Sequence, residues 1–284
     1  MIETILIYGL GLIGGSIAYR LKDLDAQYRV IGLDVNKSRV EYGKNSGVIV
    51  DGYSEHSSVP WQDVDLVILC TPVRTLRDIV SKIKPFLKNT TIVTDVGSVK
   101  GNIVKDLHYL LAPIRFVGGH PIAGTEKEGI ESALPTLFVN ARIILTPLES
   151  TNKQALDIVE DLWKLLGGSV EYMDPYLHDV IFGGISHLPH VIAFSLVDTA
   201  MRISQKINFD IITYTGGGFK DTTRIAASTP SMWRDIFLEN KQNVLESIRI
   251  FKDALADLEK AIMNNDDQEI EDIIRKVSDR RKRV

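Results

Sequence analysis

The sequence has few of the features that mark secreted, membrane or nucleic-acid-binding proteins. It contains one cysteine, Cys70, so no disulfide can form within the chain. Acidic residues outnumber basic ones by 37 to 33, and the one basic run lies at residues 280–283, which argues against a nucleic-acid or anionic-membrane surface. The sequence contains no run of about 18 apolar residues, which is the length that would predict a membrane span. We therefore expect a soluble, cytoplasmic protein with neither nucleic-acid nor membrane partners.

The first part of the chain alternates short apolar runs with helix-like stretches. The length of 284 residues, 44% of them hydrophobic and 25% charged, suits one large domain or two ordinary ones. The apolar runs lack polar alternation, which is typical of strands buried on both faces of a parallel sheet. The expected strands are residues 5–8, 30–33, 66–69, 91–94, 115–117, 142–145 and 170–172, and the expected helices are 13–24, 36–44, 73–83 and 99–110.

The pattern changes after Asp174 and Pro175, where strand signals become scarce. Residues 240–263 carry apolar side chains mostly at three- or four-residue steps, which is typical of an amphipathic helix. We therefore predict an α/β domain over residues 1–174, with a Rossmann-type, doubly wound and mostly parallel sheet, followed by an all-α domain over residues 175–284. The helical domain is expected to contribute to substrate binding and to form a homodimer.

A dinucleotide-binding motif follows the first expected strand. Gly9, Gly11 and Gly14 form G-x-G-x-x-G at the start of a helix, where glycines permit a tight turn and a close approach of the pyrophosphate. Asp34 ends the next strand, 20 residues after Gly14, and its carboxylate favours NAD because it would repel the 2′-phosphate of NADP. Lys37 and Arg39 lie nearby and could bind that phosphate, so NADP is the alternative cofactor. The predicted cofactor-binding residues are Gly9, Gly11, Leu12, Ile13, Gly14, Asp34, Thr71 and Pro72.

One histidine lies where the nicotinamide of such a cofactor is expected. His120 follows Gly118 and Gly119 in a loop after the strand at residues 115–117, and ligands bind at the carboxyl ends of strands in a doubly wound sheet. A neutral imidazole can accept a hydroxyl proton while hydride leaves the same carbon. Ser98, in a neighbouring loop, is expected to hydrogen-bond the ring and fix its tautomer. The structural alternatives are a loop-capping histidine and an ordinary helix N-cap serine.

The helical half adds two further motifs. The first, S-H-L-P-H at residues 186–190, places two histidines three residues apart, but no carboxylate or cysteine accompanies them, so we predict no metal site. The second, G-G-G-F-K-D-T-T-R at residues 216–224, suggests carboxylate recognition by Arg224, whose alternative is a surface pair with Asp221. Met232 and Trp233 are equally suited to line an aromatic substrate or to fill a core.

These motifs together resemble the prephenate dehydrogenases of tyrosine biosynthesis, from Gly9 through Asp235. The resemblance implies NAD-dependent oxidative decarboxylation of prephenate to 4-hydroxyphenylpyruvate, with His120 as the catalytic base and Ser98 as its partner. It also implies that Glu126 organises the substrate site and that Arg224 binds a substrate carboxylate. The predicted substrate-binding residues are Arg224, His190, Ser186, Glu126, Thr125, Gly217, Trp233 and Met232.

Three other functions compete with this one. Arogenate dehydrogenase is the nearest, since arogenate differs from prephenate only by an amino group in place of a keto group. A β-hydroxyacid dehydrogenase would carry a lysine on the first long helix of the second domain, and residues 181–196 contain none. A non-catalytic NAD-sensing regulator would not need His120, Ser98 and Arg224 together. Tyrosine, if it inhibits, is expected to act at the active site itself.

Overall fold

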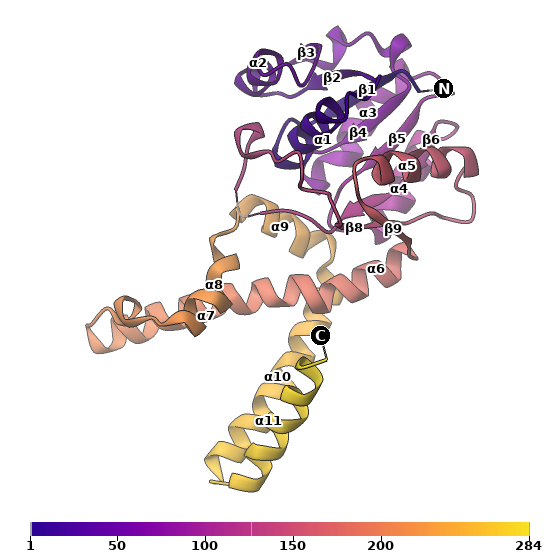
Figure 1. Cartoon of the computed structure of the whole chain (residues 1–284). Helices are drawn as coiled ribbons and strands as arrows, with labels where there is room; N and C mark the ends of the chain where they lie inside the picture. The colour runs from indigo at the N-terminus through magenta and orange to yellow at the C-terminus, as the bar shows by residue number, and fades with distance from the viewer. Residues whose placement is uncertain (1, 126, 284) are drawn as a thin grey trace.

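The computed structural model describes residues 2–125 and 127–283 and opens with a six-stranded parallel sheet (Figure 1). The strands are β1 (Thr4–Tyr8), β2 (Arg29–Leu33), β3 (Asp51–Tyr53), β4 (Leu66–Leu69), β5 (Ile92–Asp95) and β6 (Arg115–Val117), in the order β3-β2-β1-β4-β5-β6. The connecting helices are α1 (Leu12–Asp23), α2 (Lys37–Asn45), α3 (Leu76–Ile83) and α4 (Gly101–Leu111). This order is that of a doubly wound dinucleotide-binding sheet, as the sequence predicts.

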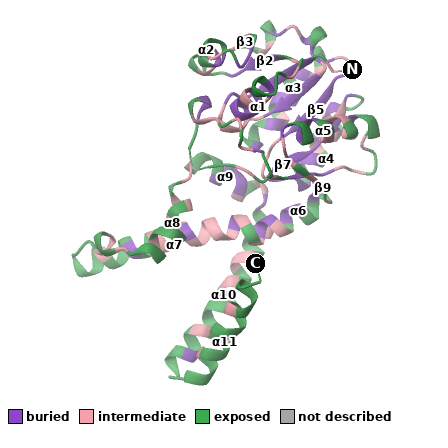
Figure 2. Ribbon diagram, viewed as in Figure 1, coloured by how far each residue is buried: buried purple, intermediate pink, exposed green. Residues whose placement is uncertain are grey.

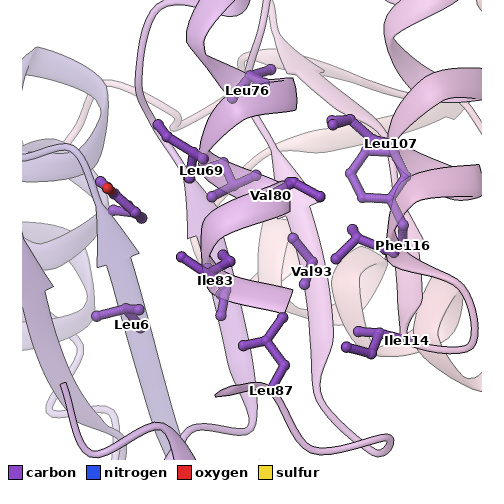
Figure 3. Close-up of a cluster of buried hydrophobic side chains, with 14 of the residues drawn as sticks. Leu6, Leu69, Leu76, Val80, Ile83, Leu87, Val93, Leu107, Ile114 and Phe116 are labelled. Atoms are coloured by element: carbon purple, nitrogen blue, oxygen red, sulfur yellow. The ribbon is translucent and has the colours of Figure 1, made fainter. Parts of the chain in front are cut away.

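The central strands are buried on both faces, which explains their unbroken apolar sequences. In β1, Leu6 belongs to one hydrophobic cluster while its neighbours Ile5 and Ile7 belong to the other, because successive side chains of a strand point to opposite faces. Figure 3 shows the first cluster, to which α3 contributes Val80 and Ile83 and the sheet contributes Leu6, Leu69 and Val93. Each such fully buried side chain stabilises the fold by roughly 1.5–3 kcal/mol.

A second, three-stranded sheet follows the first. It contains β7 (Gly119–Pro121), β8 (Arg142–Leu145) and β9 (Ser169–Tyr172), with β7 antiparallel to β8 and β8 parallel to β9, and α5 (Lys153–Leu165) joins the last two. Two expectations are therefore wrong. The runs at 142–145 and 170–172 do not extend the parallel sheet, and His120 lies on a short strand opposite Ile144 instead of in a loop.

From Pro175 onward the chain is helical, as predicted. The elements are α6 (Pro175–Phe182), a π-helical turn (Gly183–His187), α7 (Leu188–Ile207), α8 (Gly217–Thr223), α9 (Pro230–Glu239), α10 (Lys241–Met263) and α11 (Asp267–Arg281). Single 3-10 turns lie at His56–Ser58, Trp61–Asp63, Val73–Thr75, Lys84–Phe86, Ile130–Ser132, Ile211–Tyr214 and Arg224–Ala227. The Asp174 carboxylate caps α6 by accepting from the backbone N–H groups of Tyr176 and Leu177. A domain boundary at residue 174 stays a prediction that this abrupt helix start supports.

Much of the helical part is apolar and yet exposed. The continuous helical segment Pro175–Ile207 is long and apolar enough to cross a membrane, and only 22% of its most apolar window is buried. Scattered polar residues interrupt its apolar ones, so no unbroken apolar run marks this segment in the sequence. In α10, Val244 is buried, but Leu255 and Ile262 are more than half exposed. Figure 2 shows α10 and α11 as a largely exposed hairpin that projects away from the sheets.

A buried ion pair joins the two sheets. The Lys100 ammonium contacts the Asp95 carboxylate at the end of β5, and both side chains are fully buried. Lys100 Nζ also donates to the carbonyl oxygen of Gly119 at 2.8 Å, while the Asp95 carboxylate accepts from the N–H groups of Gly97 and Gly119. The pair therefore holds the backbone of β7 against the end of β5.

Removal of this buried cation is expected to destabilise the whole chain. Lys100→Met leaves the Asp95 carboxylate buried without its counter-ion, which should lower the free energy of unfolding by about 3–5 kcal/mol. Lys88→Met, which breaks the part-exposed pair with Asp65, should cost only about 0–1 kcal/mol. Urea unfolding followed by circular dichroism measures both. Equal losses in the two variants would contradict the structural role given to Lys100.

Candidate active site

The glycine-rich turn between β1 and α1 is shaped to bind a dinucleotide. Gly9 has a φ of +105°, and a Cβ there would lie 2.7 Å from the carbonyl oxygen of Cys70. A Cβ on Gly14 would lie 2.0 Å from the carbonyl oxygen of Gly9, so only glycine fits at either position. Gly11 caps α1 without a side-chain hydrogen bond, and a Cβ on it would have no atom within 4 Å. This helix N-terminus therefore has N–H donors and open space for a pyrophosphate, with Leu12 and Ile13 in its first turn.

Asp34 lies beside that turn at the end of β2. Its carboxylate accepts from the N–H groups of Leu10 and Asn36, both at 2.8 Å, and Arg39 Nη1 approaches it at 3.8 Å. The carboxylate is thus fixed by two backbone N–H groups and faces a guanidinium, and its binding of the ribose hydroxyls stays a prediction. Thr71 and Pro72 follow β4, the neighbour of β1 on its other side, so all predicted cofactor residues lie at the carboxyl edge of adjacent strands.

The ring of His120 is held where β7 meets α6. Its Nδ1 lies 2.8 Å from Nε2 of His178 in α6, and its ring centroid lies 5.1 Å from those of His178 and Phe182. Burial lowers the pKa of His120 well below the ordinary histidine value, and the nearby charges of His178, Lys100 and His187 lower it further. His120 is therefore a neutral imidazole at neutral pH, the form that can accept a proton.

The glycine pair before His120 allows this placement. A Cβ on Gly118 would lie 2.6 Å from Oγ1 of Thr146, and one on Gly119 would lie 2.9 Å from the carbonyl oxygen of Asp95. Both glycines thus let β7 pass close to β5 and β8, with His120 extending from the short strand.

The residue that contacts the His120 ring, His178, is not among those predicted from the sequence. His178 is fully buried, and its Nδ1 lies 2.9 Å from Oδ1 of Asp179. Within the part of the chain that is described, no hydrogen bond joins Ser98 to His120, and the ring nitrogen Nδ1 contacts His178 instead. The expectation that Ser98 fixes the tautomer stays a prediction. A catalytic role for Ser98 toward substrate stays a prediction. The only local signal for His178 was its place one turn into a capped helix, and that signal is weak.

Several predicted substrate-binding residues gather around an aromatic stack. The rings of His190 and Trp233 stack with centroids 3.5 Å apart, and Nδ1 of His190 donates to the carbonyl oxygen of Ser186 at 2.9 Å. Burial lowers the pKa of His190, its hydrogen bond to the Ser186 backbone raises that pKa, and the charge of Arg224 lowers it. Trp233 is buried in the core that it shares with α3, whereas Met232 is 42% exposed and fills no core.

The remaining predicted residues lie at the margin. Gly217 opens α8 in an exposed position. Thr125 is also exposed, and its hydroxyl accepts from the N–H of Lys127 at 3.2 Å. Glu126 lies outside the described residues. His187 belongs instead to the interior, where Asn240 Nδ2 donates to its Nδ1 at 3.0 Å and burial lowers its pKa to about 4.

Comparison with known proteins decides the family. Residues 17–172 match the family described as prephenate dehydrogenase, nucleotide-binding domain, and residues 174–276 match the prephenate dehydrogenase dimerization domain. This chain belongs to the prephenate dehydrogenase family. It is accordingly an oxidoreductase that uses NAD, and the resemblance drawn from the sequence motifs is confirmed.

Curated members of the prephenate dehydrogenase family match over most of the chain. A prephenate dehydrogenase of Bacillus subtilis is 39% identical over 87% of this chain, which spans 66% of that protein's length. A cyclohexadienyl dehydrogenase of Zymomonas mobilis is 36% identical over 93% of this chain and 90% of its own.

Solved structures of the prephenate dehydrogenase family agree in fold. A prephenate dehydrogenase of Aquifex aeolicus, in complex with hydroxyphenyl propionate and NAD+, is 43% identical with a TM-score of 0.95, covering 100% of this chain and 98% of that one. An arogenate dehydrogenase of Synechocystis is 30% identical with a TM-score of 0.81, covering 99% of this chain and 100% of that one.

The cofactor preference of this family member is expected to depend on Asp34. Asp34→Asn removes the charge that repels a 2′-phosphate and frees Arg39 to bind one. The ratio of the NADPH to the NADH dissociation constant should therefore fall about 10- to 100-fold, as expected for one or two hydrogen bonds to charged groups. Fluorescence titration of the reduced cofactors measures both constants. The double variant Asp34→Asn/Arg39→Met should lose the NADPH gain, and an unchanged ratio in Asp34→Asn would refute the assignment.

Proposed function

We propose that the chain converts prephenate to 4-hydroxyphenylpyruvate with NAD+, in tyrosine biosynthesis, and that His120 is the general base. The observation that carries this proposal is the state of His120. It is half-buried and neutral, its Nδ1 is engaged by His178, and it lies near the carboxyl edge of the sheet that holds the dinucleotide turn. The second ring nitrogen is thus left for the substrate hydroxyl.

The proposed reaction is balanced without a net change in protons. Bound NAD+ takes the hydride from the ring carbon that carries the hydroxyl. His120 Nε2 accepts the hydroxyl proton as that carbon is oxidised. The bond between the ring and its carboxylate then breaks, CO2 leaves, and the electron pair completes the aromatic ring. The proton returns from His120 to the ring oxygen, which leaves a phenol.

The other predicted residues bind and orient the substrate in this scheme. Arg224 pairs with a substrate carboxylate. A guanidinium is better suited to this role than an ammonium because its planar N–H donors match the two carboxylate oxygens. The stack of His190 on Trp233 gives a flat apolar wall for the ring, which favours an aromatising substrate. Ser98, Ser186, Thr125, Glu126, Gly217 and Met232 complete the proposed set.

Prephenate is preferred here to arogenate as the substrate. Relatives named prephenate dehydrogenase include the Bacillus subtilis and Aquifex aeolicus proteins, whereas the arogenate dehydrogenase of Synechocystis is less similar in sequence and in fold. The cyclohexadienyl dehydrogenase of Zymomonas mobilis is compatible with either.

The helical domain is proposed to form a homodimer. The match to a dimerization domain and the exposed apolar faces of α7 and α10 support this, because contiguous apolar surface in a native protein generally marks an interface. We assign residues 1–174 to the NAD-binding domain and residues 175–284 to the substrate and dimer domain. A cytoplasmic location and inhibition by tyrosine at the active site belong to the same proposal, since tyrosine shares a hydroxyphenyl ring and a carboxylate with the product.

Turnover of the two candidate acids tests the activity directly. Purified chain should form NADH from NAD+ with prephenate at a kcat/KM at least tenfold above that with arogenate, measured by absorbance. NADP+ in parallel reactions serves as the control for cofactor choice. Absence of turnover with both acids would refute the proposed function.

Substitutions at two residues should separate chemistry from binding. His120→Asn is expected to lower kcat by about 10²- to 10⁴-fold, whereas Arg224→Ala should mainly raise KM. Only neutral His120 accepts a proton, and its pKa is lowered, so kcat/KM of the native enzyme should stay level as pH falls to about 6.5 and decline only below it. Steady-state rates from pH 4.5 to 9 measure this profile. A near-native kcat in His120→Asn would show that another group is the base.

A further inference from the structure

A line of three side chains leads from the proposed base into the helical domain. His120 Nδ1 lies 2.8 Å from His178 Nε2, and His178 Nδ1 lies 2.9 Å from Asp179 Oδ1. His120 belongs to β7, whereas His178 and Asp179 belong to α6, and both α6 side chains are buried. The hydrogen bonds therefore cross from one domain to the other.

The Asp179 carboxylate sets the direction of these hydrogen bonds. Its two oxygens accept from the backbone N–H groups of Lys100 and Gly101, both at 2.8 Å, at the N-terminus of α4. That helix end favours a negative charge, and an ionised carboxylate only accepts. The proton between Asp179 and His178 is therefore on His178 Nδ1, so His178 Nε2 accepts from His120. His120 consequently carries its proton on Nδ1 and presents an unprotonated Nε2.

The surroundings of Asp179 are built around this arrangement. A Cβ on Gly101 would lie 2.7 Å from Asp179 Oδ2, so glycine is needed for the helix end to receive the carboxylate. On the other side, Asn240 Nδ2 donates to the carbonyl oxygen of Asp179 at 2.8 Å. Asp179 is thus fixed by the nucleotide-binding domain through its side chain and by the α9–α10 junction through its backbone.

We propose that His178 and Asp179 are positioning residues that hold His120 in the tautomer whose Nε2 accepts the substrate proton. This inference rests on the proposed function, in which His120 is the base. Because the two residues lie in α6, the base is complete only when the helical domain is docked on α4. As His120 becomes positively charged, the Asp179 carboxylate stabilises that charge through His178.

Two substitutions of His178 test the hydrogen bond to His120. His178→Leu removes the acceptor and should lower kcat with prephenate by about 10- to 100-fold, with KM changed much less. His178→Gln restores a carbonyl oxygen as acceptor and should recover at least tenfold of a 100-fold loss. The matched control is His108→Leu, which removes a histidine of α4 that is hydrogen-bonded to Ser150, and this variant should keep the native kcat.

Asp179→Asn tests the direction of the bonds. Its amide can donate to His178 Nδ1, which would reverse both hydrogen bonds and place the His120 proton on Nε2. We expect a loss in kcat of about 10²- to 10⁴-fold despite the nearly identical shape. Several ionisable groups lie close enough to His120 and His178 to affect the pH dependence of kcat. They are His178 and Asp179 of α6, Lys100 before α4, Asp95 of β5 and His187 of the π-helical turn.

Nitrogen-15 NMR of the imidazoles gives a readout that needs no substrate. With six histidines in the chain, single His→Gln variants can assign the signals. Native His120 should show a protonated Nδ1 and an unprotonated Nε2, and Asp179→Asn should reverse them. A native His120 protonated on Nε2, or native kcat in His178→Leu, would overturn the inference. A native enzyme inactive on prephenate would refute the proposed function alone, because the NMR result would still decide the tautomer.

Discussion

The docking of the Asp179 carboxylate on the N-terminus of α4 is the interaction on which the site depends. It satisfies two N–H groups that a helix end leaves without intrahelical partners, and it does so with a side chain from the other domain. The same carboxylate orients His178, and His178 orients His120. One contact therefore joins the domains and prepares the proposed base, so the relative position of the domains and the protonation of His120 depend on each other.

A second buried charge complements the first. Lys100 contributes its backbone N–H to Asp179, while its ammonium contacts Asp95 and the carbonyl oxygen of Gly119. The backbone of β7 is thus held by the ion pair, and the ring of His120 is held by His178. Because buried charges without partners are costly, these groups specify one arrangement of strand, helix and ring. The residues from Asp95 to Gly101 act in both, which explains why a short loop after β5 carries so much polar contact.

The sequence predicts those parts of the fold that depend on neighbouring residues. The glycine turn and Asp34 lie on consecutive elements, and the buried strands have unbroken apolar sequences, so both could be predicted. The pairing of His120 with His178 could not, because the two are 58 residues apart and the residues around His178 do not mark it as the partner of His120. Strand β7 is three residues long and contains glycine and proline, so its sequence favours a loop, and only pairing with β8 makes it a strand. The apolar repeat of α10 correctly indicates a helix but does not say what covers its exposed face.

The exposed apolar surface of the helical part also includes α7, which packs against the segment that carries Arg224. Helix α8 is seven residues long, and neither it nor the turn that carries Arg224 has a buried residue. Helices this short gain little from their own hydrogen bonds and depend on packing for their stability. The stack of His190 on Trp233 is anchored in the core. In contrast, α8 and the Arg224 turn pack against α7, which carries exposed apolar side chains such as Met201, Ile203 and Ile207. The proposed homodimer would cover those side chains, so formation of the dimer and ordering of the carboxylate-binding side of the site are expected to be coupled.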